Sequence, residues 1–380
     1  MASFPSGSLS TVQLVQLRTG VERTEAPPTP VVPAAVLAHG CTTLPLVDRI
    51  DRRIGYLRVS LTDRCNYRCT YCMPDRPGDY GPRAELLTLE EVAAIVAAFA
   101  AAGVERVRLT GGEPLLRRGL VELVANLSRL SGPQGALEVV LTTNGEHLES
   151  LAGPLAQAGL HAITVSVDSL IESRFAAITR RGRLPRVIAG IDAALASGLP
   201  VKLNTVAVRG FNDDELGELA MWAWRRGATP RFIELMPMAS GELFVPGELM
   251  PAHDIREAIA AAIGSPLRPS DAPSIRGLGP ARYHAVERGE FAGAVLGTIG
   301  AMTENFCASC NRLRLSASGA LHGCLAHDDA GDLRSALRHS NDPQALHDVV
   351  QRVIGTKRDG HGFHADGSGG PRKSMMSIGG

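Results

Sequence analysis

Six of the seven cysteines fall into two groups whose spacing is typical of metal centres. The first group, Cys65, Cys69 and Cys72, has the form C-x3-C-x2-C. Three thiolates on one loop can hold three irons of a 4Fe–4S cluster, and the fourth iron then stays open for chemistry. A structural zinc site usually closes four ligands from paired C-x2-C units, and neither a fourth Cys nor a His is adjacent here. The spacing therefore favours an iron–sulfur cluster over zinc.

The second group, Cys307, Cys310 and Cys324, has the form C-x2-C-x13-C. His322 and His327 lie close to it in the sequence, so a Cys3His zinc site is a real alternative. Taken alone, this group fits zinc and a cluster equally well. Beside the first group, a second 4Fe–4S cluster with another open iron becomes the better interpretation.

Two arginines follow the second group's Cys-x2-Cys pair. Arg312 and Arg314 alternate within an expected strand and therefore share one face of it. They could belong to a solvated edge strand. They could equally form an anion pocket beside the cluster, because the guanidinium fork matches phosphate oxygens.

The seventh cysteine, Cys41, stands apart in a segment rich in Pro, Ser, Thr and Ala. We expect residues 1–46 to form a disordered extension and Cys41 to be a free thiol without a role. An odd cysteine count in a chain of this length argues against a disulfide framework.

Short β-rich runs alternate with helical patterns between residues 47 and 265. We expect strands at Tyr56–Leu61, Arg106–Thr110, Leu137–Thr142, His161–Val167, Val201–Val208 and Arg231–Met236. Helices are expected near 88–102, 117–130, 149–158, 185–197, 213–226 and 253–263. The alternation predicts parallel βα units, and the near-continuous apolar strands predict a sheet buried on both faces. Periodicity alone allows a partial barrel, a full barrel or a doubly wound sheet.

The pattern changes after residue 265. Pro and Gly become frequent, and strand-like pieces at Phe291–Ile299 and Arg312–Ser316 precede helical stretches near 331–339 and 343–355. We expect an α/β protein with a partial (βα)6 TIM-type barrel in residues 47–265. A smaller C-terminal domain in 266–356 would carry the second cluster. Residues 357–380 would be a mobile tail ending in Gly379-Gly380.

Polar residues close five of the expected strands. They are Thr62-Asp63, Thr110 to Glu113, Thr142 to Gly145, Ser166 with Asp168, and Glu234 to Met236. Each alone could be a turn or a helix cap. Because parallel strands place their C-terminal ends at one edge, together they predict an active site there.

Charge and hydropathy exclude some partners. Lys+Arg and Asp+Glu both number 39, and a balanced chain is not typical of a nucleic-acid binder. The longest apolar run, Val92 to Val104, is shorter than the about 18 residues of a membrane span. Without a visible secretory signal, we expect a cytoplasmic protein that binds neither nucleic acid nor membrane.

The first cysteine motif resembles the signature of the radical S-adenosylmethionine superfamily, with an aromatic residue before the third Cys. Gly111-Gly112-Glu113-Pro114 is similar to the superfamily motif that holds the methionyl amino group. The resemblance implies that the open iron chelates S-adenosylmethionine. Its reductive cleavage yields a 5′-deoxyadenosyl radical, which takes a hydrogen atom from the substrate.

Longer sequence segments indicate one family within this superfamily. LRVSLTDRCNYRCTYCMP, RVRLTGGEPLLRR, LTTNG, ITVSVD, VKLNTV, RFIELMPM, FCASCNRLRLSASGALHGCL and the terminal Ile-Gly-Gly occur in this order. Over residues 48–356 they resemble the GTP 3′,8-cyclases of molybdenum-cofactor biosynthesis. These enzymes abstract the ribose C3′ hydrogen of GTP and join C3′ to C8 of guanine.

The resemblance also implies individual roles. Two 4Fe–4S clusters would be held by Cys65, Cys69 and Cys72, and by Cys307, Cys310 and Cys324. S-adenosylmethionine would be contacted by Tyr71, Gly112, Ser166 and Met236. GTP would be contacted by Arg58, Arg108, Thr142, Lys202, Arg312 and Arg314, with the guanine ring on the open iron of the second cluster. Gly379 and Gly380 would reach into the active site.

The resemblance further implies an external electron donor and a cyclic pyranopterin monophosphate synthase that accepts the product. A homodimer is a possible assembly. Two other functions are open on sequence grounds: another radical S-adenosylmethionine enzyme with an auxiliary cluster, such as a peptide-modifying one, and a non-enzymatic metal-binding protein. The first has no reason to carry the arginine pair and the double-Gly end, and the second does not need the GGEP motif.

Overall fold

A computed structural model describes residues 46–75, 80–238, 244–271, 279–339 and 343–378. The predicted N-terminal extension up to residue 45, Cys41, Gly379 and Gly380 lie outside the described residues.

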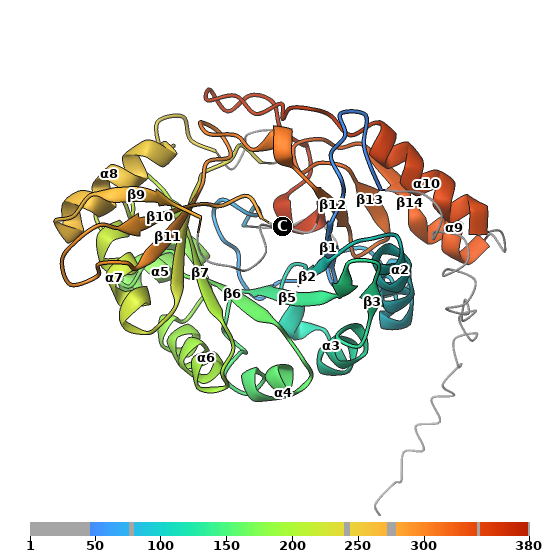
Figure 1. The fold of residues 1–380 in the computed structure, drawn as a ribbon, viewed down its shortest axis with the longest axis horizontal. Coiled ribbons are helices and arrows are strands. Elements are labelled where there is room, and N and C mark those ends of the chain that lie inside the picture. The colour runs from blue at the N-terminus through green and yellow to red at the C-terminus, as the bar shows by residue number, and fades with distance from the viewer. Residues whose placement is uncertain (1–45, 76–79, 239–243, 272–278, 340–342, 379–380) are drawn as a thin grey trace, which may run out of the picture. The chain divides into compact units, whose positions relative to one another are not determined.

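Twelve strands of the described chain form one sheet, in the order β14-β13-β12-β1-β2-β5-β6-β7-β8-β11-β10-β9 (Figure 1). They are β1 Tyr56–Ser60, β2 Arg106–Thr110, β5 Glu138–Thr143, β6 Ala162–Ser166, β7 Val201–Ala207, β8 Thr229–Glu234, β9 Leu267–Ser270, β10 Arg282–Val286, β11 Val295–Ile299, β12 Arg312–Leu315, β13 Ala320–His322 and β14 Ala330–Asp332. β3 Ser131–Gly132 and β4 Gly135–Ala136 form a separate hairpin.

The helices are α2 Leu89–Ala101, α3 Leu120–Leu127, α4 Ala152–Gln157, α5 Glu172–Thr179, α6 Leu184–Ala196, α7 Leu216–Arg225, α8 Ala252–Ile263, α9 Leu333–His339 and α10 Pro343–Gly355. Short 3-10 helices cover Arg83–Glu85, Pro114–Leu116, Cys307–Ser309 and Met375–Ile378. In the described part of the chain, none of the helices is both long and apolar enough to cross a bilayer.

The predicted α/β fold with a mostly parallel sheet is confirmed. Each of the six predicted strands is present, shifted by at most a few residues, and each is followed by a helix. Helix α2 shows why: Thr88 and Glu91 form a capping box at its start, and Val92, Ile95 and Phe99 recur on its buried face. Figure 1 shows α2, α3, α4 and α6 on the outer face of the curved sheet, which leaves the inner face for the site.

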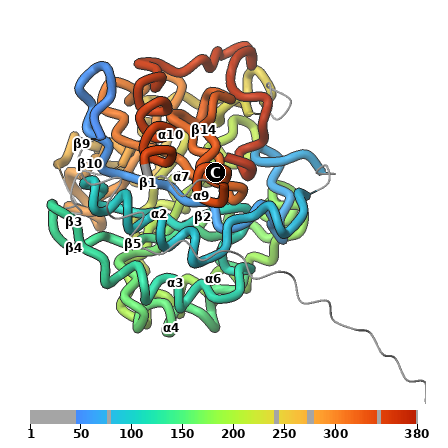
Figure 2. Tube along the Cα trace, turned by 90° about the vertical axis from the view of Figure 1, so that its right-hand side faces the viewer, coloured from blue at the N-terminus to red at the C-terminus, as the bar shows by residue number. Residues whose placement is uncertain are grey.

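The C-terminal strands continue the same sheet. β12 pairs in parallel with β1, with Arg314 opposite Arg58, and β11 pairs in parallel with β8. Beyond β12, the antiparallel strands β13 and β14 carry α9 and α10 (Figures 1 and 2). The N-terminal strand β1 therefore lies inside the sheet, between β12 and β2.

Candidate active site

The first cysteine loop follows β1 and is held by backbone contacts to the end of β2. Gly112 N–H donates to Thr62 O at 2.6 Å, and Glu113 N–H donates to Arg64 O at 2.8 Å. A Cβ at Gly112 would lie 2.2 Å from Arg64 O, so only glycine allows this approach. The GGEP segment thus shapes the loop that carries Cys65.

Glu113 of the same motif ties two strand ends together. Its buried carboxylate accepts hydrogen bonds from Thr143 Oγ1 at 2.6 Å, Asn144 N–H at 2.8 Å and Leu115 N–H at 2.9 Å. Burial raises the pKa of Glu113 to about 7. Asn144 in turn donates to Asn66 Oδ1 at 2.8 Å, inside the cysteine loop.

The three thiols of the loop lie close enough to interact electrostatically. Burial, and then the charge of Cys72, raise the pKa of Cys69 well above its ordinary value. Burial, and then the charge of Cys65, raise the pKa of Cys72 to about 12. Cys65 Sγ accepts a hydrogen bond from Tyr67 N–H at 3.4 Å, and Cys72 accepts one from the backbone of Met376. The three cysteines are half-buried, and neighbouring thiolates need positive charge between them, so this donor set fits a cluster with three Cys ligands.

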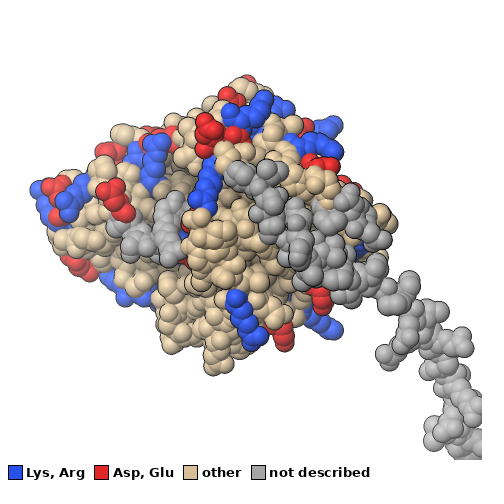
Figure 3. Space-filling view, turned by 45° about the vertical axis from the view of Figure 1, so that its right-hand side comes forward, with Lys and Arg blue, Asp and Glu red and all other residues tan. Residues whose placement is uncertain are grey.

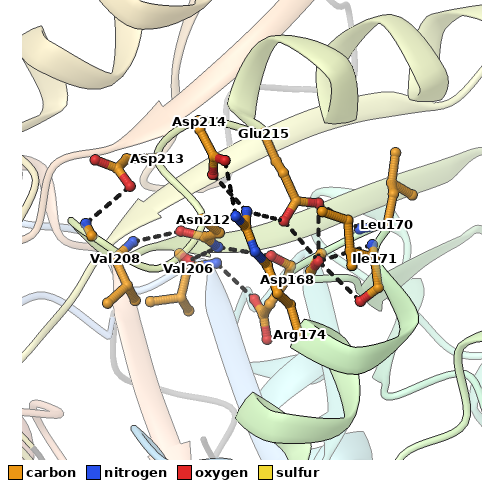
Figure 4. A network of polar contacts seen from close by, with 12 residues as sticks. Asp168, Leu170, Ile171, Arg174, Val206, Val208, Asn212, Asp213, Asp214 and Glu215 are labelled. Carbon is orange, nitrogen blue, oxygen red and sulfur yellow. Dashed lines mark hydrogen bonds and ion pairs between the residues drawn. The ribbon is translucent and has the colours of Figure 1, made fainter.

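Tyr71 connects the cysteine loop to a buried polar network at the ends of β6 and β7. Its hydroxyl donates to Asp168 Oδ2 at 2.8 Å, and Val206 N–H donates to Asp168 Oδ1 at 2.8 Å. Asn212 Nδ2 donates to Asp168 O and Val206 O, which fixes the turn after β7 (Figure 4). The pKa of Asp168 is raised to about 6 by burial. The Tyr71 hydroxyl is therefore fixed by a buried carboxylate that is itself held by hydrogen bonds.

A cavity of about 320 Å³ lies on the inner face of the sheet. Its walls are alternate residues of successive strands, which point to the same face. The strand residues are Tyr56, Arg58, Arg106, Arg108, Thr142, Ser166, Lys202, Asn204, Val206, Arg231, Ile233, Tyr283, Ile299, Arg312 and Arg314. The rest of the wall comes from loops and from the C-terminal segment, which contribute Tyr71, Asp168, Met236, Asp271, Gly279, Pro280, Ala281, Ala301, Phe306, Leu325 and Met375.

Cations from neighbouring strands are in register across this cavity. Arg314, Arg58 and Arg108 lie opposite one another on β12, β1 and β2. Arg108 donates to Tyr56 Oη, to Thr142 Oγ1 at 2.8 Å and to Thr164 Oγ1 at 3.0 Å. All three partners are hydroxyl groups, which carry no charge in their ordinary protonated form. They therefore orient the Arg108 guanidinium without neutralising its charge.

The close approach of these cations, together with their burial, lowers the pKa values of two of the side chains that line the cavity. Burial, and then the charges of Arg231, Arg108 and Arg106, lower the pKa of Lys202 to about 7. Burial, and then the charge of Arg108, lower the pKa of Arg231 to about 10. Such a cavity is an electrostatic match for a polyanion. On the face drawn in Figure 3, by contrast, acidic and basic side chains lie close together.

A second cavity, of about 70 Å³, is lined by Cys307, Cys310 and Cys324. It shares Met236, Phe306, Arg312 and Arg314 with the larger cavity, so the two adjoin. The Arg312 guanidinium lies 4.7 Å from the centroid of the Phe306 ring, which orients it at the boundary.

N–H groups surround these thiols. Cys310 Sγ accepts from Arg312 Nη2 and Lys357 Nζ, both at 3.6 Å, and Cys324 Sγ accepts from Ala326 N–H at 3.4 Å. Burial alone would raise the pKa of Cys310, but the charges of Arg312 and Lys357 lower it to about 6. Three thiols with N–H donors in one cavity fit a second 4Fe–4S cluster.

The histidines that made zinc an alternative lie elsewhere. His322 is buried in β13, where both ring nitrogens lack a partner among the described residues, and His327 Nε2 contacts Gly360 O at 3.3 Å. The histidine that lines the cysteine cavity is His361, from the C-terminal segment.

The structure brings together nine residues that the sequence assigned to S-adenosylmethionine or GTP. Tyr71, Ser166, Met236, Arg58, Arg108, Thr142, Lys202, Arg312 and Arg314 all line the larger cavity. Gly112 and the first cysteine group do not line it, although Tyr71 between the cysteines does. Sequence reasoning missed Tyr56, Arg106, Asn204 and Arg231. The first three alternate with the predicted Arg58, Arg108 and Lys202 along β1, β2 and β7, and that alternation was the available signal; β8 carries no predicted residue that could have pointed to Arg231.

Two family profiles match successive parts of the chain. The profile described as Radical SAM superfamily matches residues 59–223, and that described as Molybdenum Cofactor Synthesis C matches residues 228–363. A solved structure of Streptococcus suis SuiB bound to precursor peptide SuiA covers 55% of this chain and 45% of that chain, at 16% identity and a TM-score of 0.45. This likeness is too distant to bear on the site.

Curated proteins match over most of their length. GTP 3′,8-cyclase of Rhizobium meliloti is 45% identical over 325 residues, which cover 86% of this chain and 90% of that protein. GTP 3′,8-cyclase of Rhodopseudomonas palustris is 44% identical over 334 residues, covering 88% and 94%. That of Brucella canis is 44% identical over 324 residues, covering 85% and 92%.

Proposed function

We propose that the larger cavity binds GTP between two 4Fe–4S clusters. The chain belongs to the GTP 3′,8-cyclase family of radical S-adenosylmethionine enzymes. The reaction is the conversion of GTP to (8S)-3′,8-cyclo-7,8-dihydroguanosine 5′-triphosphate, the first step of molybdenum-cofactor biosynthesis. One observation supports this most: residues suited to S-adenosylmethionine, to a triphosphate and to the second cluster line two adjoining cavities.

The cofactors divide between the two cysteine groups. Cys65, Cys69 and Cys72 would hold the first cluster and, through its open iron, S-adenosylmethionine, with Tyr71, Gly112, Ser166 and Met236 around it. When bound, this pair supplies the 5′-deoxyadenosyl radical that takes the C3′ hydrogen of GTP. Cys307, Cys310 and Cys324 would hold the second cluster.

The protein's own contribution is orientation. The triphosphate would lie against Arg58, Arg108 and Lys202, with Thr142 beside Arg108. Arg312 and Arg314, which line both cavities, would hold the nucleotide where the larger cavity opens toward the second cysteine group. The ribose would then lie between the clusters. Because C3′ and C8 belong to one molecule, holding both ends sets their approach.

Further proposals concern partners and organisation. The reaction requires an external electron donor, and we propose a cyclic pyranopterin monophosphate synthase as the product acceptor, a cytoplasmic location and a homodimer. We retain a barrel domain of residues 47–265, an auxiliary-cluster domain of 266–356 and a tail from 357.

The test is anaerobic. The protein is reconstituted with iron and sulfide, reduced, and given S-adenosylmethionine with and without GTP, and both 5′-deoxyadenosine and the nucleotide product are measured. We expect GTP-dependent 5′-deoxyadenosine together with a cyclised nucleotide. Cys65→Ala should abolish cleavage of S-adenosylmethionine, whereas Cys324→Ala should keep the first cluster and lose GTP turnover.

Three results would count against the proposal. Cyclisation of GTP by Cys324→Ala would refute the assignment of the second cluster. 5′-Deoxyadenosine without any change in GTP would keep the radical chemistry but point to another substrate. Zinc in place of iron at the second cysteine group, measured by metal analysis, would remove the auxiliary cluster altogether.

A further inference from the structure

Lys357 places a buried ammonium group beside the second cysteine cavity. The residue follows α10 directly, its N–H donates to Ile354 O at 3.1 Å, and only 4% of its surface is exposed. Its Nζ donates to Gly323 O at 2.5 Å, Arg312 O at 3.0 Å and Cys310 Sγ at 3.6 Å. All three donors of the ammonium are therefore used.

These contacts join parts of the second cysteine group that are far apart in the chain. Cys310 belongs to the Cys-x2-Cys pair, Arg312 begins β12, and Gly323 immediately precedes Cys324. A Cβ at Gly323 would lie 3.5 Å from Lys357 Cβ, so the two backbones are closely packed. One ammonium thus fixes the spacing between two of the three cysteines.

A second buried cation holds the remaining cysteine. Arg52 Nη1 donates to Cys307 O at 2.6 Å and Nη2 donates to Arg358 O at 2.8 Å, while Nε pairs with buried Asp48 at 2.5 Å. Arg52 has this carboxylate as a counter-charge. No carboxylate is among the contacts of Lys357 Nζ in the described ranges. The group in contact that can balance this buried charge is the Cys310 thiol, whose Sγ lies 3.6 Å from Nζ.

We propose that Lys357 is a positioning residue for the auxiliary cluster, whose Cys310 ligand and sulfides would place negative charge beside this ammonium. The inference rests on the proposed function. A bound 4Fe–4S cluster carries anionic thiolates and sulfides, and an adjacent positive charge favours its reduced state. Lys357 therefore sets both the geometry of the cysteine group and the reduction potential of the cluster.

The test compares two substitutions at adjacent positions in the reconstituted full-length protein. Lys357→Gln and Arg358→Gln both remove one positive charge, but the Arg358 side chain is 55% exposed and pairs with Asp329. The midpoint potential of each cluster is measured by redox titration followed by electron paramagnetic resonance. Added S-adenosylmethionine identifies the signal of the first cluster. Iron content is measured in parallel.

We expect Lys357→Gln to shift the auxiliary potential to more negative values and leave the first cluster unchanged. Arg358→Gln should match the wild type at both clusters. Selective loss of the auxiliary iron in Lys357→Gln would also support the positioning role. Wild-type potentials in Lys357→Gln, or equal shifts in both variants, would overturn it.

If Lys357→Gln loses both clusters, the positioning role is tested with Lys357→Arg, because this variant keeps the positive charge and the hydrogen-bond donors. Recovery of a near-wild-type auxiliary potential in Lys357→Arg supports the proposal, and loss of both clusters there overturns it. The wild-type protein separates the two hypotheses. A wild type without an iron cluster at the second cysteine group contradicts the proposed function, whereas two clusters with an unresponsive Lys357→Gln contradict only this inference.

Discussion

Lys202 links the protonation of the protein to nucleotide binding. Its pKa is lowered to about 7 by burial and by neighbouring arginines, so part of the population is neutral at physiological pH. The cost of burying the charged lysine is fully present below about pH 7, and it is relieved as the pH rises from about 7 toward the ordinary value of 10.5. A triphosphate beside Lys202 would reverse this shift.

We therefore predict that GTP binding takes up a proton above pH 7. Between pH 7.5 and 8.5 the phosphates are fully ionised, since their second pKa is about 6. The affinity should fall as the pH rises, by at most about tenfold per pH unit. Calorimetry of the oxidised protein in buffers of different ionisation enthalpy measures the proton uptake. Lys202→Met should abolish it; equal uptake in Lys202→Met and the wild type would contradict the assignment.

Residue types alone revealed much of the site, but not all of it. The cysteines, GGEP and the Arg312–Arg314 alternation carry their chemistry in their spacing. Arg231 carries no such signal, because β8 is largely buried and burial does not show which face of a strand lines a cavity. His361 was missed because only the folding of the C-terminal segment brings it to the cysteines.

At the scale of elements, the turn after β6 depends on a buried carboxylate at the start of α7. Glu215 accepts hydrogen bonds from Ser169 Oγ at 2.9 Å, Leu170 N–H at 3.0 Å and Arg174 Nη1 at 2.7 Å (Figure 4). The same Arg174 also pairs with Asp214. The Glu215 side chain is 4% exposed and that of Asp214 is 63% exposed, so one arginine serves a buried and a solvated partner.

This contrast gives a matched pair of substitutions. Glu215→Ala should lower the free energy of unfolding by about 3–5 kcal/mol, because it leaves buried hydrogen-bond donors and one member of an ion pair without a partner. Asp214→Ala should cost less than about 1 kcal/mol, as is usual for exposed pairs. Denaturant unfolding of the two variants measures the difference. Similar losses would mean that the network stabilises the turn no more than a surface pair does.

The elements that the sequence predicted are those with a long apolar signal. The six parallel strands and their helices were found because each buries a continuous or periodic apolar run. Helix α5 was missed because its start lacks a side-chain cap and its eight residues, ESRFAAIT, have little apolar periodicity. Strands β13 and β14 have three residues each, too few for a period-two pattern.

At the scale of the whole molecule, pairing between β12 and β1 crosses the predicted domain boundary. A chain truncated at residue 265 would lose β11 and β12, which leaves β8 and β1 as exposed parallel edges. Such edges invite aggregation. We expect the truncated chain to be insoluble, or expanded in size-exclusion chromatography, whereas the full-length chain elutes as a compact species. A compact, cluster-binding product from residues 47–265 would show that the barrel domain is independent.

The place of β1 inside the sheet also affects the order of events during synthesis. β1 and the first cysteine loop leave the ribosome early, but the strand that covers one side of β1 is made near the end of the chain. At roughly 5–20 residues per second, the intervening chain takes on the order of 10 to 50 s to synthesise. During that interval β1 is an open edge of the nascent sheet, directly before the first cysteine loop. The first cysteine group would therefore be accessible to chaperones and cluster carriers before the second group has been synthesised.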